Sequence, residues 1–153
     1  MKKVLHLLFF LKLPILFAQV DINYSIEAKF YEKDGRIDIN QIISFKNISD
    51  NSIETIYMND WANSYSNTDT PLAKRFGEEY DRSFYLSSKN KLGFTMIDYI
   101  KENGNEINWS RLSDQKDIIR IALNRPLKKN NSVNIDLKYS VKLPDSKFTG
   151  YGN

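Results

Sequence analysis

Few side chains in this sequence have the types and spacing that catalysis or metal binding needs. Glu78 and Glu79 are adjacent carboxylates, a pair that general acid–base chemistry can use. Glu78 also lies four residues before Arg82, the spacing of an ion pair on a solvated helix face. Asp60 and Asp69 could offer oxygens to calcium, but their spacing does not match a calcium loop. We therefore predict solvated charges here and assign no catalytic, cofactor-binding or metal-binding residue.

Two reactive residue types are almost missing. The sequence has no cysteine and a single histidine, His6, which lies in an apolar leader segment. The chain after the leader therefore has no thiol and no imidazole for a catalytic triad or a metal site. No nucleophile with a neighbouring base is recognisable either. We expect no cofactor in this chain.

The leader, residues 1–18, has the composition of a secretory signal peptide. Lys2 and Lys3 precede an apolar run, Val4–Phe17, and the leader ends on a small residue. A membrane anchor is the alternative, but Lys12 divides the run into pieces far shorter than the roughly 20 residues of a span. We expect cleavage, no stable membrane span afterwards, and export to the periplasm or the extracellular space.

The charge of the chain depends on this leader. The whole sequence has 22 Lys plus Arg and 19 Asp plus Glu, a formal net charge of +3. Lys2, Lys3 and Lys12 belong to the leader, so acidic and basic residues balance in the remainder of the chain. Without a cationic excess, the sequence predicts no nucleic-acid partner.

Apolar residues that alternate with polar ones predict strands through most of residues 19–153. Ile22–Phe30 and Ile37–Phe45 have this period of two, with Gln41 as a polar interruption, and the turn Glu32–Gly35 joins them into a hairpin. We expect each strand to be half-buried. Further strands are predicted at Ile53–Met58, Phe94–Lys101, Ile107–Leu112, Ile118–Leu123 and Val133–Leu143.

Turn signals set how these later strands connect. Asn103-Gly104 predicts a hairpin between the strands on either side, and Arg125-Pro126 is expected to end the strand before it. Seven strands with one helix between them predict a mainly β fold, an antiparallel β-sandwich-like domain with one inserted amphipathic helix.

The segment Tyr57–Tyr80 carries the inserted helix. Its first part, Asn59–Asp69, fits no strand pattern and is predicted to be a loop. Asp69 or Thr70 can cap the helix, and Pro71 suits its first position. At 100° per residue, an arc of about 120° holds Leu72, Ala73, Phe76, Tyr80 and Phe84. This spacing predicts three to four turns, lying on the sheet.

Aromatic residues gather in and after this segment, at Trp61, Tyr65, Tyr80, Phe84 and Tyr85. They could form an exposed platform that binds sugar or protein, or fill the interface between helix and sheet. We favour the interface, because aromatic side chains dominate core energetics. Four Asn-x-Ser/Thr triplets are interpreted as polar surface; they begin at Asn23, Asn47, Asn108 and Asn130.

The passage IYMNDWANSYSNTDTPLAKRF, Ile56–Phe76, resembles the N-terminal domain of exported bacterial metallopeptidases of the aminopeptidase N family, the gluzincins. Two shorter pieces, INWSRL (Ile107–Leu112) and LPDSKFTGYG (Leu143–Gly152), are also similar to that group. The resemblance implies a β-rich domain packed against a separate catalytic domain. In the family that second domain carries H-E-x-x-H, binds one zinc and cleaves N-terminal residues from peptides.

No H-E-x-x-H occurs in this sequence, so none of the family's catalytic residues is carried over. We expect residues 19–153 to be a β-rich N-terminal domain, truncated at its C-terminal end and inactive alone. Zinc is then implied only for a missing catalytic domain, which would be the partner of this one and would meet the peptide substrate. A stand-alone secreted β-sandwich that binds glycan or protein is the alternative.

Overall fold

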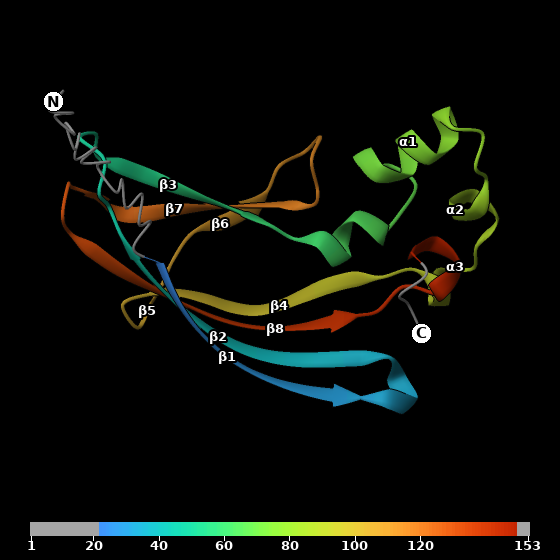
Figure 1. Ribbon diagram of the computed structural model, residues 1–153, viewed down its shortest axis with the longest axis horizontal. Helices are drawn as coiled ribbons and strands as arrows, with labels where there is room; N and C mark the ends of the chain where they lie inside the picture. Colours follow the sequence, from blue (N-terminus) through green and yellow to red (C-terminus); the bar gives the residue numbers. More distant parts are fainter. Residues whose placement is uncertain (1–21, 150–153) are drawn as a thin grey trace, which may run out of the picture.

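The computed structural model describes residues 22–149, so the leader and its predicted cleavage lie outside the described part. The strands form two antiparallel sheets (Figure 1). In order across the larger sheet they are β1 Ile22–Tyr31, β2 Arg36–Lys46, β8 Ser132–Lys142, β4 Phe94–Glu102 and β5 Asn105–Glu106. The smaller sheet has the order β3 Ile53–Asn59, β7 Ile118–Leu127 and β6 Trp109–Arg111. The predicted mainly β, sandwich-like fold is confirmed.

The first hairpin forms as the alternation predicts. β1 and β2 pair without interruption from Ile22 opposite Phe45 to Tyr31 opposite Arg36. A single turn of 3-10 helix, η1 Glu32–Asp34, connects them. Gly35 closes the turn at φ 54°, a left-handed conformation that glycine adopts without steric cost. β2 then pairs with β8, the strand of cleanest alternation, which lies at the centre of the sheet.

The main core lies where the smaller sheet covers the larger one, towards the end of β2 and the beginning of β8. β8 contributes Val133, Ile135 and Leu137, each almost fully buried. The remaining buried members come from both layers and from the crossing between them: Ile43, Ile100, Ile107, Ile119, Ile121 and Leu127. This packing joins the two sheets into a sandwich.

The predicted second hairpin is only partly correct. Asn103 and Gly104 form a tight turn with φ of 49° and 86°, but β4 and β5 share just two residue pairs. The chain then crosses to the other layer, and β6 pairs with β7 instead of β4. Ile107 lies at the crossing: its N–H still donates to Ile100 O on β4 at 3.3 Å, the next carbonyl accepts from Ala122 on β7 at 3.1 Å, and its side chain is buried in the core between the sheets. Burial of this apolar side chain stabilises the crossing.

The predicted break at Arg125-Pro126 is wrong, since β7 continues through it to Leu127. The pairing with β3 is irregular here, jumping from Thr55 opposite Ala122 to Ile53 opposite Leu127. Proline is tolerated inside such an irregularity because no ladder hydrogen bond from its nitrogen is needed.

The prediction of a single helix of three to four turns is also wrong. Thr70 caps α1 Pro71–Glu78 as predicted, and its Oγ1 accepts a hydrogen bond from the Ala73 N–H at 3.2 Å. The helix ends at Glu78, because Tyr80 turns to φ 62°. The N–H of Tyr80 donates to Gly77 O at 3.1 Å and the next N–H donates to Phe76 O at 2.8 Å, the pattern of a Schellman cap. A separate turn, α2 Ser83–Leu86, comes next.

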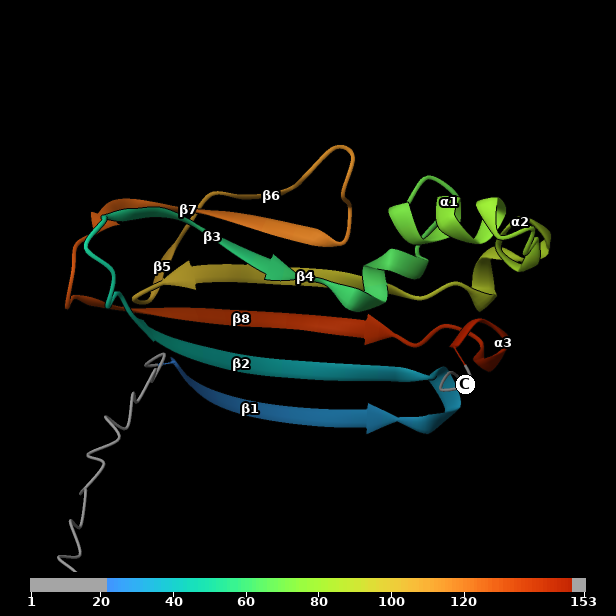
Figure 2. The same ribbon diagram turned by 45° about the horizontal axis from the view of Figure 1, so that its top comes forward.

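The helices lie beyond one end of the sandwich instead of on the sheet (Figures 1 and 2). They surround a second core with Tyr65, Ala73, Phe84 and Phe148 at its centre. The Phe84 ring lies 5.8 Å from that of Tyr65 and 4.9 Å from that of Phe148, centroid to centroid. Phe148 comes from α3 Ser146–Thr149, and Tyr65 ends the 3-10 helix η2 Trp61–Tyr65. A third 3-10 turn, η3 Lys89–Lys91, leads towards β4.

The predicted half-burial of β1 is wrong. Its alternation is that of a strand, yet Tyr24, Ile26 and Phe30 remain 59%, 57% and 55% exposed. These residues point to the inner side of the larger sheet, but the smaller sheet does not extend over the outer strand. Within residues 22–149 no helix is long and apolar enough to cross a membrane.

Candidate functional site

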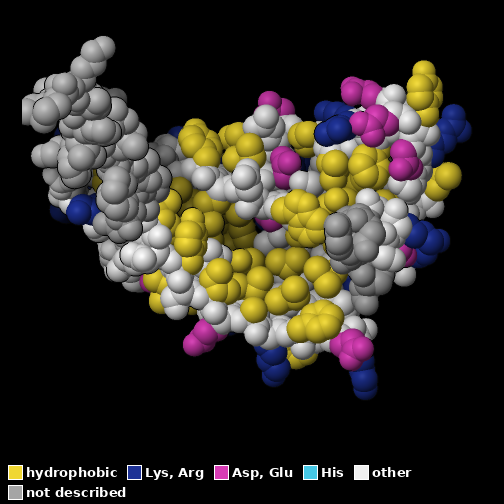
Figure 3. Space-filling model, viewed as in Figure 1, with side chains coloured by type: hydrophobic (Ala, Val, Ile, Leu, Met, Phe, Trp, Pro, Cys, Tyr) yellow, Lys and Arg dark blue, Asp and Glu magenta, His cyan; other side chains and the backbone are white. Residues whose placement is uncertain are grey.

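An uncovered apolar surface is the most unusual feature of the molecule. We call it the open face: the part of the inner side of the larger sheet that lacks a covering layer. β1 contributes Tyr24, Ile26 and Phe30, and half-buried side chains of β2 and β8 continue it, Ile39, Tyr139 and Val141. Figure 3 shows hydrophobic side chains gathered over these strands, in a hollow between the two layers. Such a patch marks an interaction surface.

The open face deepens into a groove of about 270 Å³ where it meets η2. Leu137 and Tyr139 lie on the sheet side, and Met58 and Trp61 lie on the opposite side. The Tyr139 hydroxyl donates a hydrogen bond to Gln41 Oε1 at 2.8 Å. Burial, and secondarily the negative charge of Asp60, raises the pKa of Tyr139 above its usual value. The tyrosine is therefore a neutral hydrogen-bonding group at neutral pH.

Behind the groove, Asp60 holds three elements together. Its carboxylate is buried at the start of η2 and accepts hydrogen bonds from Thr95 Oγ1 on β4 and from Arg111 on β6, with Arg111 Nη2 at 2.7 Å. The same Arg111 atom also donates to the Thr95 carbonyl at 3.1 Å. Asp69, the other predicted calcium candidate, instead lies 3.7 Å from Lys116. The two aspartates are thus held by different cations and do not form one site.

The paired glutamates behave as the solvated interpretation predicts. Glu78 and Glu79 are both exposed. The ion pair on this helix joins Arg75 Nε to Glu79 Oε1 at 2.9 Å, so the partners differ from the predicted Glu78 and Arg82. Such an exposed pair contributes little to stability.

The aromatic residues divide into two groups. Tyr65 and Phe84 are buried, as the packing interpretation predicts, but in the core of the helical end instead of a helix–sheet interface. Burial also raises the pKa of the Tyr65 hydroxyl. Trp61 and Tyr85 are 53% and 55% exposed, and Tyr80 is 94% exposed. Only Trp61 borders the groove of the open face.

Asn47 corrects the surface interpretation of the Asn-x-Ser/Thr triplets, because only 1% of it is exposed. Its amide donates to Leu127 O at 2.7 Å and to Asn51 O at 2.8 Å, while its oxygen accepts the Ser49 N–H at 2.9 Å. This asparagine is an internal connector between the turn after β2 and the end of β7. Nothing in the sequence distinguishes it from the other three triplets.

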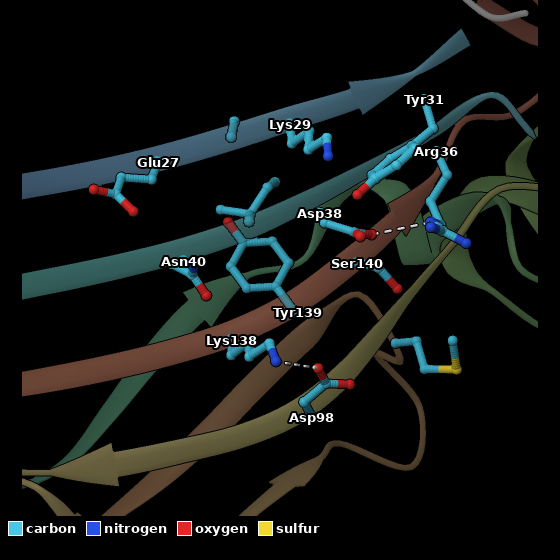
Figure 4. A pocket seen from close by; sticks show the side chains of 13 residues that line it. Glu27, Lys29, Tyr31, Arg36, Asp38, Asn40, Asp98, Lys138, Tyr139 and Ser140 are labelled. Atoms are coloured by element: carbon cyan, nitrogen blue, oxygen red, sulfur yellow. Dashed lines mark hydrogen bonds and ion pairs between the residues drawn. The ribbon is translucent and has the colours of Figure 1, made fainter. Parts of the chain in front are cut away.

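The outer side of the larger sheet is polar (Figure 4). Its charges are largely paired, with Arg36 Nε 3.0 Å from Asp38 Oδ1 and Lys138 Nζ 3.8 Å from Asp98 Oδ2. The Arg36 guanidinium also lies 4.7 Å from the Tyr31 ring centroid. Because opposite charges alternate across this surface, it does not build the single-sign field that attracts a charged ligand.

Among the described residues no group of three or more His, Cys, Asp or Glu side chains could hold a metal ion. The donor set that zinc requires is not offered by this part of the chain, so we derive no step through zinc. The fold and its surfaces define a β-sandwich whose distinctive feature is an apolar face suited to docking.

No protein-family model matches the sequence, and no curated protein matches it. Solved structures similar to this one include M1 zinc metallopeptidases. One is a two-domain mutant bound to L-arginine, with 10% identity and a TM-score of 0.49, covering 80% of this chain and 21% of that one. The enzyme from Deinococcus radiodurans has 11% identity and a TM-score of 0.42, covering 71% and 16%. Its mutant bound to a Tyr-Ser-Ala substrate has 11% identity and a TM-score of 0.48, covering 80% and 21%. The chain spans about a fifth of the length of these proteins.

Proposed function

We propose that this chain is the exported N-terminal domain of a zinc metallopeptidase of the aminopeptidase N family and serves as a non-catalytic scaffold. The observation that carries the proposal is the passage Ile56–Phe76, whose sequence resembles that family. It folds into the end of β3, the η2 turn with Trp61, and a helix that begins at Pro71 behind its Thr70 cap. This is the order of strand, aromatic loop and helix that the resemblance implies.

The open face supports the scaffold role. An isolated domain gains nothing from exposing Tyr24, Ile26 and Phe30 together, and large apolar patches usually meet another protein surface. A catalytic domain that continues the chain would cover this surface and carry the zinc. Peptide would then be bound by the assembled enzyme and not by this domain alone.

The first test is to sequence the gene beyond Asn153. We expect an open reading frame that encodes H-E-x-x-H with a downstream glutamate, and a full-length protein that binds one zinc and releases N-terminal residues from peptides. Replacing the glutamate of H-E-x-x-H should abolish turnover and leave the fold of the N-terminal domain unchanged. An in-frame stop after Asn153, or several hundred residues without the motif, would contradict the proposal.

A stand-alone binding module is the second candidate, favoured by one observation. Trp61 is half-exposed at the rim of an apolar groove, the arrangement of an aromatic contact for sugar or protein. Glycan binding by the secreted chain that is lost in Trp61→Ala but kept in Tyr85→Ala would support this function. Tyr85 is the matched control because it is similarly exposed and lies on α2, away from the groove.

A further inference from the structure

β1 is an unprotected sheet edge. It is the outermost strand of the larger sheet, and within the described residues no strand pairs with its free side (Figure 2). Its ten residues contain no proline, and its register with β2 runs unbroken over the full length. Natural proteins usually interrupt such edges with bulges, prolines or inward-facing charges, because an open edge is a template for another strand.

The side chains of β1 are self-complementary. On its inner side Ile26, Ala28 and Phe30 are apolar and exposed, and on its outer side Glu27 and Lys29 carry opposite charges. Residues directly opposite each other in an antiparallel pair lie on the same side of the sheet. Two copies of β1 can therefore match apolar with apolar and acid with base in one register.

We propose that a second copy of this chain pairs with β1, antiparallel, around a two-fold axis at Ala28. In this register Glu27 of each copy lies opposite Lys29 of the other, and Ile26 lies opposite Phe30. Both of these pairs occur twice, as in isologous interfaces. The two larger sheets become one continuous sheet, and the backbone groups on the free side of β1 obtain hydrogen-bond partners.

Neighbouring registers lack this match. An axis at Glu27 places two carboxylates opposite each other, and an axis at Lys29 does the same with two ammonium groups. An axis at Ile26 leaves Glu27 opposite Ser25. Only the axis at Ala28 pairs both charges, so electrostatics selects a single arrangement. This dimer depends on the strand edge alone and is independent of the proposed function.

Charge exchange tests the partner and the register. Sedimentation equilibrium of the full chain should show a concentration-dependent dimer. Lys29→Glu or Glu27→Lys alone should weaken dimerisation by roughly tenfold, because each creates two like-charge pairs. The double exchange should restore it. Lys74→Glu, the same charge change on exposed α1, is the control and should have no effect. A monomer at every concentration, or a dimer indifferent to these exchanges, overturns the proposal.

Disulfide cross-linking tests the position of the axis itself. Because the sequence has no native cysteine, any disulfide must form between introduced residues. Ala28→Cys should give a disulfide-linked dimer on mild oxidation, since opposite Cα atoms lie about 4.5–5.5 Å apart, within bridging range. Glu27→Cys should not, because its counterpart would be about 8 Å away, beyond the reach of a disulfide. Linkage at Glu27→Cys in preference to Ala28→Cys contradicts the register.

Discussion

Tyr80 adopts a backbone conformation that is sterically unfavourable for a residue with a side chain. Its φ of 62° lies in the left-handed region, which costs roughly 1–2 kcal/mol for a residue with a Cβ atom. The side chain is 94% exposed, so little packing compensates. Glycine is the usual residue at this position of a Schellman cap.

We therefore expect Tyr80→Gly to raise the free energy of unfolding by about 1 kcal/mol, measured by urea denaturation. Tyr80→Ala is the control: it removes the same ring but keeps the Cβ atom, so stability should stay nearly constant. Equal stabilisation by both variants would show that the exposed ring, and not the backbone, is the source of the cost.

Arg111 neutralises a buried charge. Asp60 is 6% exposed, and its carboxylate accepts hydrogen bonds from Arg111 at 2.7 and 3.2 Å and from Thr95. Removing one partner of a buried pair leaves the other charge uncompensated, at a cost of roughly 3–5 kcal/mol.

Arg111→Met should accordingly lower the free energy of unfolding by about 3 kcal/mol. The double variant Asp60→Asn with Arg111→Met should be more stable than Arg111→Met alone, because no buried charge remains unpaired. Chemical denaturation of the two variants measures the coupling. A double variant that is less stable than the single one would contradict this account.

At the scale of elements, Gly93 lies just before β4 and packs closely against Pro144, which lies just after β8. A Cβ atom at this position would lie 2.7 Å from Pro144 Cδ and 2.9 Å from its backbone nitrogen. Gly77 in α1 differs, since its nearest neighbour would be the Tyr85 ring at 3.5 Å, an ordinary contact. The two glycines thus offer a matched comparison.

Gly93→Ala should destabilise the protein by roughly 1–3 kcal/mol, because backbone atoms must move. Gly77→Ala should be neutral or stabilise it by up to about 1 kcal/mol through helix propensity. Thermal unfolding of both variants tests the contrast. Similar effects at the two positions would rule out the close approach of Gly93 to Pro144 as the cause.

The elements show which parts of the fold are determined locally. Period-two alternation located β1, β2 and β8, since a strand in a sheet shows its pattern within its own residues. The N-cap at Thr70 was also predictable, because the cap and its partner are three residues apart. These features need no knowledge of distant neighbours.

The missed features depend on distant residues. The crossing at Ile107 places its side chain in the core between the sheets, and the exposure of β1 results from the limited extent of the smaller sheet. The Asp60–Arg111 pair spans 51 positions, and Asn47 bonds Leu127 across 80. A single sequence holds no signal for such pairings, so neither the polar cluster nor the groove was predictable.

At the scale of the whole molecule, the apolar side chains divide into a closed core and an open face. Ile135 is 1% exposed in the core, whereas Ile26 on the edge strand is 57% exposed. We expect Ile135→Ala to cost about 2–5 kcal/mol of unfolding free energy and Ile26→Ala less than about 1 kcal/mol. Urea denaturation at a concentration where the chain is monomeric measures both. Comparable losses would contradict the open arrangement of β1.

The open face also predicts a difference in the solvent accessibility of side chains between this chain alone and the proposed full-length enzyme. Trp61 lies at the rim of the groove, while Tyr85, with a similar exposed fraction, lies on α2, away from the groove. A domain docked on the open face should therefore shield Trp61 and leave Tyr85 accessible. Hydroxyl-radical labelling measured by mass spectrometry should show several-fold slower oxidation of Trp61 in the full-length protein than in this chain, with Tyr85 unchanged. If Trp61 reacts equally fast in both, the catalytic domain docks elsewhere, and the open face must serve another partner.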